Sequence, residues 1–180
     1  MLLSYRPARG NDVAVCYERL GEPFAFYQEI RKRVPGLLRG WIEDGQTVSH
    51  VIEDISELRR PRPVGFSVVV FVCESFAELL RGGETPFARA ELARRELNGE
   101  TLVLTPEQAR AANQGAGLTA LYFNQGLTNR ELDDHALHQV HARWGDTFID
   151  LRGFKLREIF CEVHDEKIQQ WGLSCGMNPR

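Results

Sequence analysis

The run VGFSVVVFVC, at residues 64–73, constrains the fold more than any other segment of the chain. It is almost entirely apolar and rich in β-branched side chains, which favour an extended backbone and pack well on a pleated surface. An apolar run of strand length without polar alternation is typical of a central strand that is covered on both faces. The sequence therefore predicts a sheet with other elements packed against both of its sides.

Shorter strand and helix patterns alternate along the rest of the 180 residues. Strands are predicted at residues 2–6, 37–43, 47–55, 118–123 and 154–163, with Asp44-Gly45 as a hairpin turn. Helices are predicted after Asn11, over residues 24–34 up to Pro35-Gly36, and from the N-terminal signals at Ser75, Thr85, Thr105, Thr128 and Asp165. Interspersed elements in a chain of this length predict a single α/β or α+β domain with a mixed sheet.

The composition excludes several classes of protein. The formal net charge is −3, and the basic runs at residues 31–33 and 59–62 are short, so we expect no nucleic-acid partner. No apolar run approaches the roughly 20 residues that a membrane span needs, and the N-terminus lacks a signal-peptide pattern, so we expect no membrane partner. The four cysteines are scattered without a CxxC pair, which favours thiols in a reducing cytoplasm.

The tripeptide Asn-Gln-Gly occurs twice, at residues 113–115 and 124–126. The first copy follows a predicted helix and precedes a strand, so we expect a flexible turn there. The second copy joins a predicted strand to a long predicted helix, where first-turn N–H groups at residues 127–130 are available to an anion. The alternative is structural, because Thr128 can cap those same donors.

Two segments resemble one family. They are Tyr5-Arg6-Pro7-Ala8 followed by Asp12, and Gly153-Phe154-Lys155-Leu156 continuing to Glu162-Val163 and then to Cys175-Gly176-Met177. Together they resemble the first and last units of GCN5-related N-acetyltransferases. The resemblance implies an acyl-CoA N-acyltransferase-like fold, in which residues 118–123 form the fourth strand, residues 154–163 the fifth, and residues 74–116 a helical insertion.

The resemblance also implies acyl-CoA, such as acetyl-CoA, as the cofactor. In the family a Gln/Arg-x-x-Gly-x-Gly/Ala loop binds its pyrophosphate, and the matching position here is the second Asn-Gln-Gly. Only Gln125 and Gly126 match that pattern. We therefore expect Gln125, Gly126, Leu127 and Thr128 to contact the cofactor through backbone or side-chain donors.

The candidate catalytic residues are Glu162, His164 and Tyr122. Glu162 and His164 follow the last predicted strand, where a general base can serve acyl transfer, and Glu162 is the first base to test. The alternatives are a surface pair for Glu162 and His164, and a core aromatic for Tyr122. The family's general-acid tyrosine is replaced by Gly172, beside Trp171.

His135, His138 and His141 lie on the long predicted helix, but they do not predict a metal site. Side chains three or four residues apart share a helix face, whereas the outer pair diverge by about 120°. We therefore expect no metal, and we interpret the three histidines as a polar flank of the helix.

Two functions remain open at this level. The first is transfer of an acyl group from acyl-CoA to an amine. The second is a non-catalytic sensor or protein-interaction domain of the same fold, which the lost glycines and the missing tyrosine favour. A small-molecule ligand suits both functions, and a homodimer fits the second.

Overall fold

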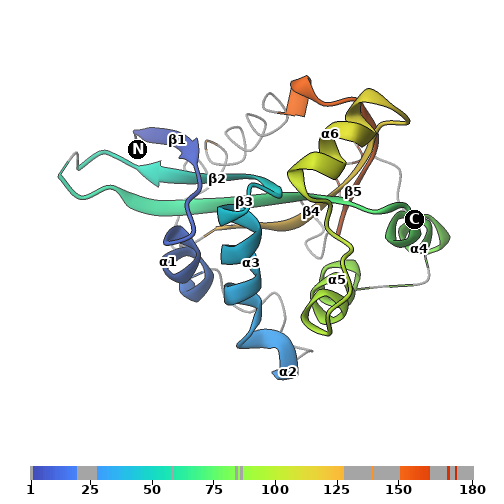
Figure 1. Ribbon diagram of the computed structural model, residues 1–180. Coiled ribbons are helices and arrows are strands. Elements are labelled where there is room, and N and C mark those ends of the chain that lie inside the picture. Colours follow the sequence, from blue (N-terminus) through green and yellow to red (C-terminus); the bar gives the residue numbers. More distant parts are fainter. Residues whose placement is uncertain are drawn as a thin grey trace.

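The computed structural model describes residues 2–19, 28–57, 59–83, 85, 87–127, 139, 151–162, 170 and 173 (Figure 1). These residues form one five-stranded sheet whose strands follow the chain order. The strands are β1 (Leu3–Pro7), β2 (Thr47–Asp54), β3 (Arg62–Val72), β4 (Leu118–Leu127) and β5 (Leu156–Cys161). The first four pair antiparallel and β5 pairs parallel to β4, so the predicted mixed sheet is confirmed.

Strand β3 is central, as its apolar run predicts. Phe66, Val68 and Val70 belong to one hydrophobic cluster, and Val69 and Phe71 belong to a second. Because successive side chains of a strand point to opposite faces, the two clusters lie on opposite sides of the sheet.

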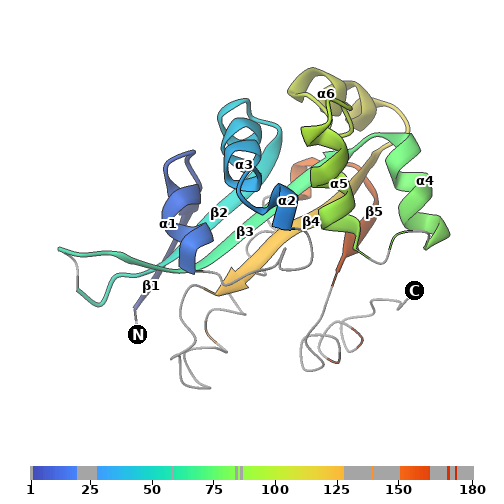
Figure 2. The same ribbon diagram turned by 90° about the horizontal axis from the view of Figure 1, so that it is seen from below.

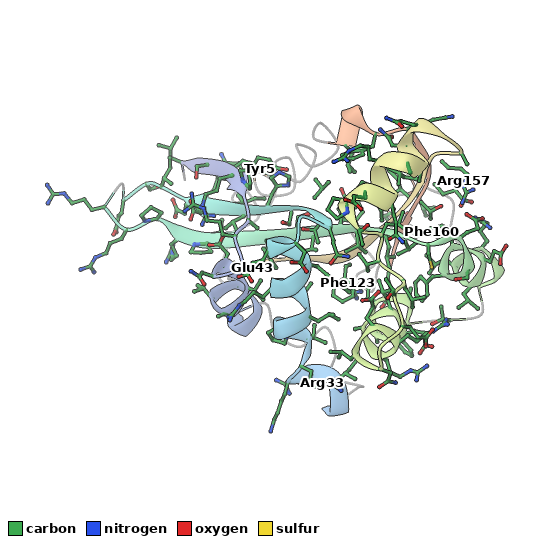
Figure 3. The ribbon with its side chains drawn as sticks, viewed as in Figure 1. Tyr5, Arg33, Glu43, Phe123, Arg157 and Phe160 are labelled. Atoms are coloured by element: carbon green, nitrogen blue, oxygen red, sulfur yellow. The ribbon has the colours of Figure 1, made fainter. Side chains whose placement is uncertain are left out.

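Helices cover both faces (Figures 1 and 2). The first cluster takes side chains from α1 (Asp12–Arg19), α2 (Gln28–Arg31), α3 (Val34–Glu43), α4 (Glu74–Gly82) and α5 (Ala88–Leu97). The second takes Ala109 from α6 (Pro106–Gln114) and Leu151 from the short 3-10 helix η1 (Leu151–Gly153). Phe123 of β4, labelled in Figure 3, meets Trp41 of α3 edge-on with ring centroids 5.0 Å apart.

The predicted strand at residues 37–43 is wrong, because this segment belongs to helix α3. Pro35 lies in the first turn of α3, where its missing N–H costs nothing, so Pro35-Gly36 opens a helix here instead of ending one. The predicted hairpin at Asp44-Gly45 is the end of the same helix. Gly45 has φ +69°, and the N–H of Gln46 donates to the Trp41 carbonyl at 2.8 Å, which is a Schellman cap.

The start signals of the next three helices had different outcomes. Helix α4 begins at Glu74 after Cys73, without the capping box predicted from Ser75. Helix α5 begins at Ala88 after Phe87, later than Thr85 predicts. Helix α6 has the full capping box between Thr105 and Gln108, which confirms the predicted start.

The opening segment that resembles the acetyltransferase family is held by ion pairs. Arg6 of β1 contacts Asp12 of α1 and Glu53 of β2, each at 2.8 Å. Hydrogen bonds from Arg6 hold the pKa of Asp12 below its usual range. This cluster therefore fixes the first helix against the edge of the sheet.

The first Asn-Gln-Gly copy is the predicted turn. Gly115 ends helix α6, and Gly117, two residues later, has φ +96°. A Cβ atom at Gly117 would lie 2.9 Å from the backbone oxygen of Lys155, so only glycine fits without a shift where the turn before β4 approaches the residue before β5.

Several predictions lie outside the described residues: the helices from Thr128 and Asp165, the three histidines, and residues 24–27 of the helix predicted at residues 24–34. The described part of that last helix is helical only over Gln28–Arg31, and α3 begins at Val34 after a turn. Within the part of the chain that the structure describes, no helix is long and apolar enough to cross a membrane.

Candidate functional site

The parallel pair β4–β5 is close at its start and open at its end. Leu118 lies opposite Leu156, and the pairing continues to Tyr122 opposite Cys161, where β5 ends. Strand β4 continues to Leu127, paired only with β3 among the described strands. Figure 2 shows the two arrows diverging toward their tips.

The second Asn-Gln-Gly copy lies inside β4, so the predicted end of this strand at residue 123 is wrong. Gln125 pairs with Ser67, Gly126 with Phe66, and Leu127 with Gly65. A local pattern could not reveal this extension, because it depends on β3 being long enough to pair with these residues. Thr128 lies outside the described residues.

The strand geometry changes what these backbone groups can do. In an antiparallel ladder, alternate residues bond to the neighbouring strand, and the residues between them point their N–H and C=O groups the other way. Along residues 123–127 the second set faces the side on which β5 has ended. Alternate amides, and not a run of helix N–H groups, therefore face the side that no described strand covers.

The candidate catalytic residues Tyr122 and Glu162 lie on opposite faces of the sheet. Tyr122 is 3% exposed and packs in the second cluster with Ala109 and Leu151. Glu162 follows β5 and bonds to Arg89 on α5, a helix of the first cluster. The two side chains therefore do not meet on one reacting atom. His164 lies outside the described residues.

Glu162 has a clear structural role. One carboxylate oxygen accepts from the backbone N–H of Arg89 at 3.1 Å, and the other accepts from Arg89 Nη2 at 3.2 Å. The side chains are 9% and 12% exposed, for Arg89 and Glu162 respectively. Helix α5 has no cap from its own N-cap side chain, so Glu162 supplies negative charge to its first turn from across the fold.

Sequence reasoning missed Arg89 as the partner of Glu162. The only sequence signal for this pair was weak. Leu92 and Ala93, three and four residues after Arg89, share its helix face and are buried. An arginine on an apolar stripe requires a buried acid nearby, because an unpaired buried charge is costly. The stripe does not say which acid that is.

Cys161, opposite Tyr122, is a poor nucleophile. Burial raises the pKa of its thiol, an effect that the nearby positive charge of Arg89 only partly offsets. The thiolate is the reactive form of cysteine, and burial disfavours it. The arrangement therefore does not support covalent catalysis at this position.

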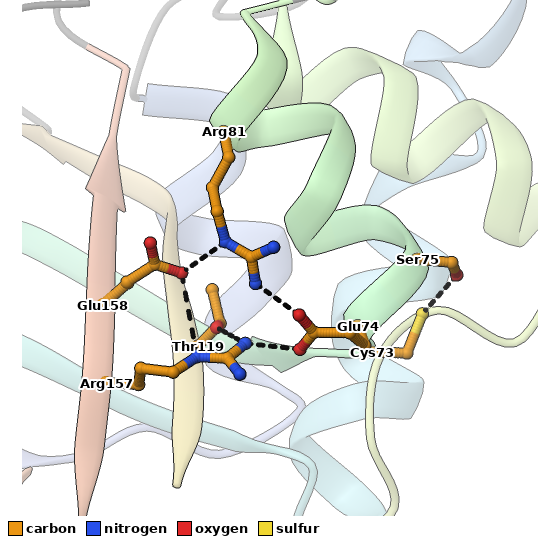
Figure 4. A network of polar contacts seen from close by, with 7 residues as sticks. All are labelled: Cys73, Glu74, Ser75, Arg81, Thr119, Arg157 and Glu158. Carbon is orange, nitrogen blue, oxygen red and sulfur yellow. Dashed lines mark hydrogen bonds and ion pairs between the residues drawn. The ribbon is translucent and has the colours of Figure 1, made fainter. Parts of the chain in front are cut away.

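A network of ion pairs around Glu74 fixes the start of β5 (Figure 4). Arg81 of α4 contacts Glu158 at 2.9 Å and Glu74 at 2.5 Å. Arg157 of β5 also contacts Glu74, and it donates to the Thr119 hydroxyl at 3.0 Å. Hydrogen bonds from Arg157, and then from Arg81, hold the pKa of Glu74 below its usual range. Both ends of β5 are thus connected to α4 or α5 by ion pairs.

Comparison with solved structures shows which known fold this chain shares. No protein-family model and no curated protein matches the chain. A GCN5-related N-acetyltransferase from Ralstonia eutropha superposes with a TM-score of 0.57 at 10% identity, covering 99% of this chain and 94% of that one. The chain has the fold of the GCN5-related N-acetyltransferases. The fold predicted from the two resembling segments is confirmed.

A second solved structure shares this acetyltransferase fold. It is a predicted acetyltransferase with acetyl-CoA from Clostridium acetobutylicum, with a TM-score of 0.55 at 9% identity over 99% of this chain and 92% of that one. Identities this low carry the architecture and no residue roles. The roles of this chain's residues must therefore come from its own geometry.

Proposed function

We propose that this protein is an acyl-CoA-dependent N-acyltransferase that binds acyl-CoA along β4 beyond Tyr122. The observation that carries the proposal is the unequal length of β4 and β5 within an acetyltransferase fold. A neighbour of the same fold has been solved with acetyl-CoA.

The edge of β4 that no described strand covers suits the amide-containing arm of coenzyme A. An extended chain can add to a strand edge by pairing with its outward N–H and C=O groups. Gln125, Gly126 and Leu127 lie in the segment that offers this edge. Bound acyl-CoA would supply an acyl thioester. An amine would form the new C–N bond at its carbonyl carbon while the C–S bond breaks and coenzyme A leaves.

Glu162 is the proposed base that takes the proton of the attacking amine. Its carboxylate lies just beyond the end of β5 and forms an ion pair with Arg89 at 3.2 Å. Each Glu162 oxygen keeps a second lone pair beside its bond to Arg89, so Glu162 can accept a proton while Arg89 holds it in place. The proposal therefore gives Arg89 the role of positioning Glu162.

A non-catalytic binding domain is the second candidate, and a specific observation favours it. Both Glu162 oxygens already accept hydrogen bonds from Arg89, and Tyr122 points to the other face of the sheet. A chain that binds acyl-CoA without transferring the acyl group would have these features.

Thermal unfolding with and without acetyl-CoA tests the binding step. A ligand that binds only the folded state at a hundred times its dissociation constant adds about 2.7 kcal/mol to the free energy of unfolding. We expect the midpoint to rise for the wild type and for the control variant Gly36→Asp. This control adds the same charge in α3, where a Cβ at residue 36 would meet no other part of the fold within 4 Å. The rise should be lost in Gly126→Asp. If Gly126→Asp binds like the wild type, the β4 edge is not the site.

Turnover separates the two candidates. Release of free coenzyme A from acetyl-CoA, measured across a set of amine acceptors, should be seen for the wild type and should fall in Glu162→Gln. Binding without release by any acceptor would instead support the non-catalytic domain.

We also propose a cytoplasmic location. The support is that, within the described part of the chain, Cys73 and Cys161 are free thiols. Fractionation of cells that produce the protein would test it, and recovery from the membrane or secreted fraction would contradict it.

A further inference from the structure

A pocket lies away from the proposed acyl-CoA site at the β4 edge. It has a volume of about 260 Å³ and is lined by the start of β2, the end of β3, helix α6 and Phe154. Phe71 and Ala109 of its lining belong to the second cluster, on the face opposite Glu162. Neither Glu162 nor residues 123–127 line it, so it is separate from the proposed acyl-CoA site.

The apolar walls of this pocket are held in place by hydrogen bonds. The rings of Phe71 and Phe154 lie 4.8 Å apart, and the N–H of Leu104 donates to the Phe71 carbonyl at 2.8 Å. Asn113 accepts from the N–H of Lys155 and donates to the carbonyl of Gly153, so it holds the backbone on both sides of Phe154. A pocket whose walls are fixed before binding loses little entropy when a ligand enters.

Most polar groups of the lining already have partners. The Thr47 hydroxyl bonds to the Ser49 hydroxyl at 3.1 Å, and the Gln46 amide donates to the Val103 carbonyl at 3.5 Å. The Asn113 side chain already bonds to the backbone of Gly153 and Lys155.

Arg110 of α6 is the exception. It is exposed, and it makes no ion pair or hydrogen bond with any residue that the structure describes, including Glu107 one turn earlier. The described lining contains no acidic residue, so the positive charge of Arg110 is not compensated inside the pocket.

We infer that this pocket binds a small carboxylate with an apolar, preferably aromatic, body. The guanidinium of Arg110 matches a carboxylate in charge and in its pair of parallel donors. Phe71 and Phe154 provide aromatic surface for the body of the ligand. The volume is slightly below the range of drug-sized ligand sites, which suits a single-ring compound.

Phenylacetate is the probe for a test by NMR titration of the full chain. Its addition to millimolar concentration should shift the backbone amides of Gln46, Leu104 and Phe154. Benzyl alcohol, which keeps the ring and lacks the charge, should bind at least about tenfold more weakly.

Two variants separate a specific site from general charge attraction. Arg110→Gln should weaken phenylacetate binding about tenfold or more, whereas Arg39→Gln, the same change on an exposed arginine of α3, should leave it unchanged. Acetyl-CoA should stabilise Arg110→Gln as it stabilises the wild type, since the two sites are separate. Absence of shifts with phenylacetate, or equal binding by Arg110→Gln and the wild type, would overturn the inference whatever acetyl-CoA does.

Discussion

The two ends of the β4–β5 pair differ, although the same tripeptide lies near each. At the start, the Asn-Gln-Gly at residues 113–115 ends helix α6, and Gly117 brings the backbone close to Lys155. At the end, the Asn-Gln-Gly at residues 124–126 continues β4 after β5 has stopped. The difference teaches that the surrounding partners, and not the tripeptide, decide between turn and strand.

The two ends of the β4–β5 pair also differ in what they can do. The start is fixed by Asn113, by Gly117 and by the cluster around Glu74. The end has Glu162 and Arg89 on one side and an open strand edge on the other. A fixed start holds the two strands while their ends diverge, which leaves a strand edge for a ligand.

The largest expected effect is at the open end. Glu162→Ala should lower the free energy of unfolding by about 3 to 5 kcal/mol, because it leaves the charge of buried Arg89 without its partner. Urea denaturation measures this loss. The double variant Arg89→Leu/Glu162→Leu should be more stable than Glu162→Ala, and a double variant as unstable as the single one would argue against the buried ion pair.

At the fixed start, Gly117→Ala should cost about 3 kcal/mol, because it combines a left-handed backbone with a 2.9 Å contact to the Lys155 oxygen. Gly99→Ala is the matched control: Gly99 has φ +93° with no atom within 4 Å, so its loss should be only about 1 to 2 kcal/mol. Equal losses in the two variants would show that the turn at Gly117 does not approach Lys155 this closely.

Asn113→Ala should cost about 1 to 2 kcal/mol, because it removes two hydrogen bonds to the backbone around Phe154. The adjacent and exposed Gln114→Ala should cost less than about 0.5 kcal/mol. Thermal unfolding of both variants checks the difference, and similar midpoints would mean that Asn113 does not hold this segment.

The smallest expected effect is a pH dependence at the start of β5. The pKa of Glu74 is held low by Arg157 and Arg81, so its contribution to stability is present above its unfolded-state pKa of about 4.3. That contribution is lost as the pH falls through the lower folded-state pKa. Because Glu74 is exposed, Glu74→Gln should cost less than about 1 kcal/mol at pH 7.

The same comparison at low pH provides the control. Once Glu74 is protonated, the wild type and Glu74→Gln should have the same unfolding midpoint. A difference that persists at low pH, or that grows there, would contradict the ionic account of this cluster.

Local signals predicted the elements whose structure is decided locally. The apolar run of β3 and the capping box of α6 carried enough information in their own residues. Pro35-Gly36 and Asp44-Gly45 misled, because proline and glycine mark both ends of a helix as well as turns. The distinction depends on the burial of Val34, Leu38 and Trp41, which only the packed structure shows.

The candidate site was predicted less well for a related reason. Extension of β4 to Leu127 depends on pairing with Gly65, more than fifty residues earlier in the chain. The contact between Glu162 and Arg89 joins residues 73 positions apart. No local pattern contains such pairings. Roles for His164 and Thr128, which lie outside the described residues, and a homodimer stay predictions.

Hydrogen exchange with and without acetyl-CoA tests the central claim most directly. If acyl-CoA binds along the open end, the ligand should slow exchange of alternate amides at residues 123–127. Exchange at residues 118–122, already paired with both neighbouring strands, should change little. Unchanged exchange along the whole of β4, at acetyl-CoA concentrations that stabilise the protein, would contradict the account.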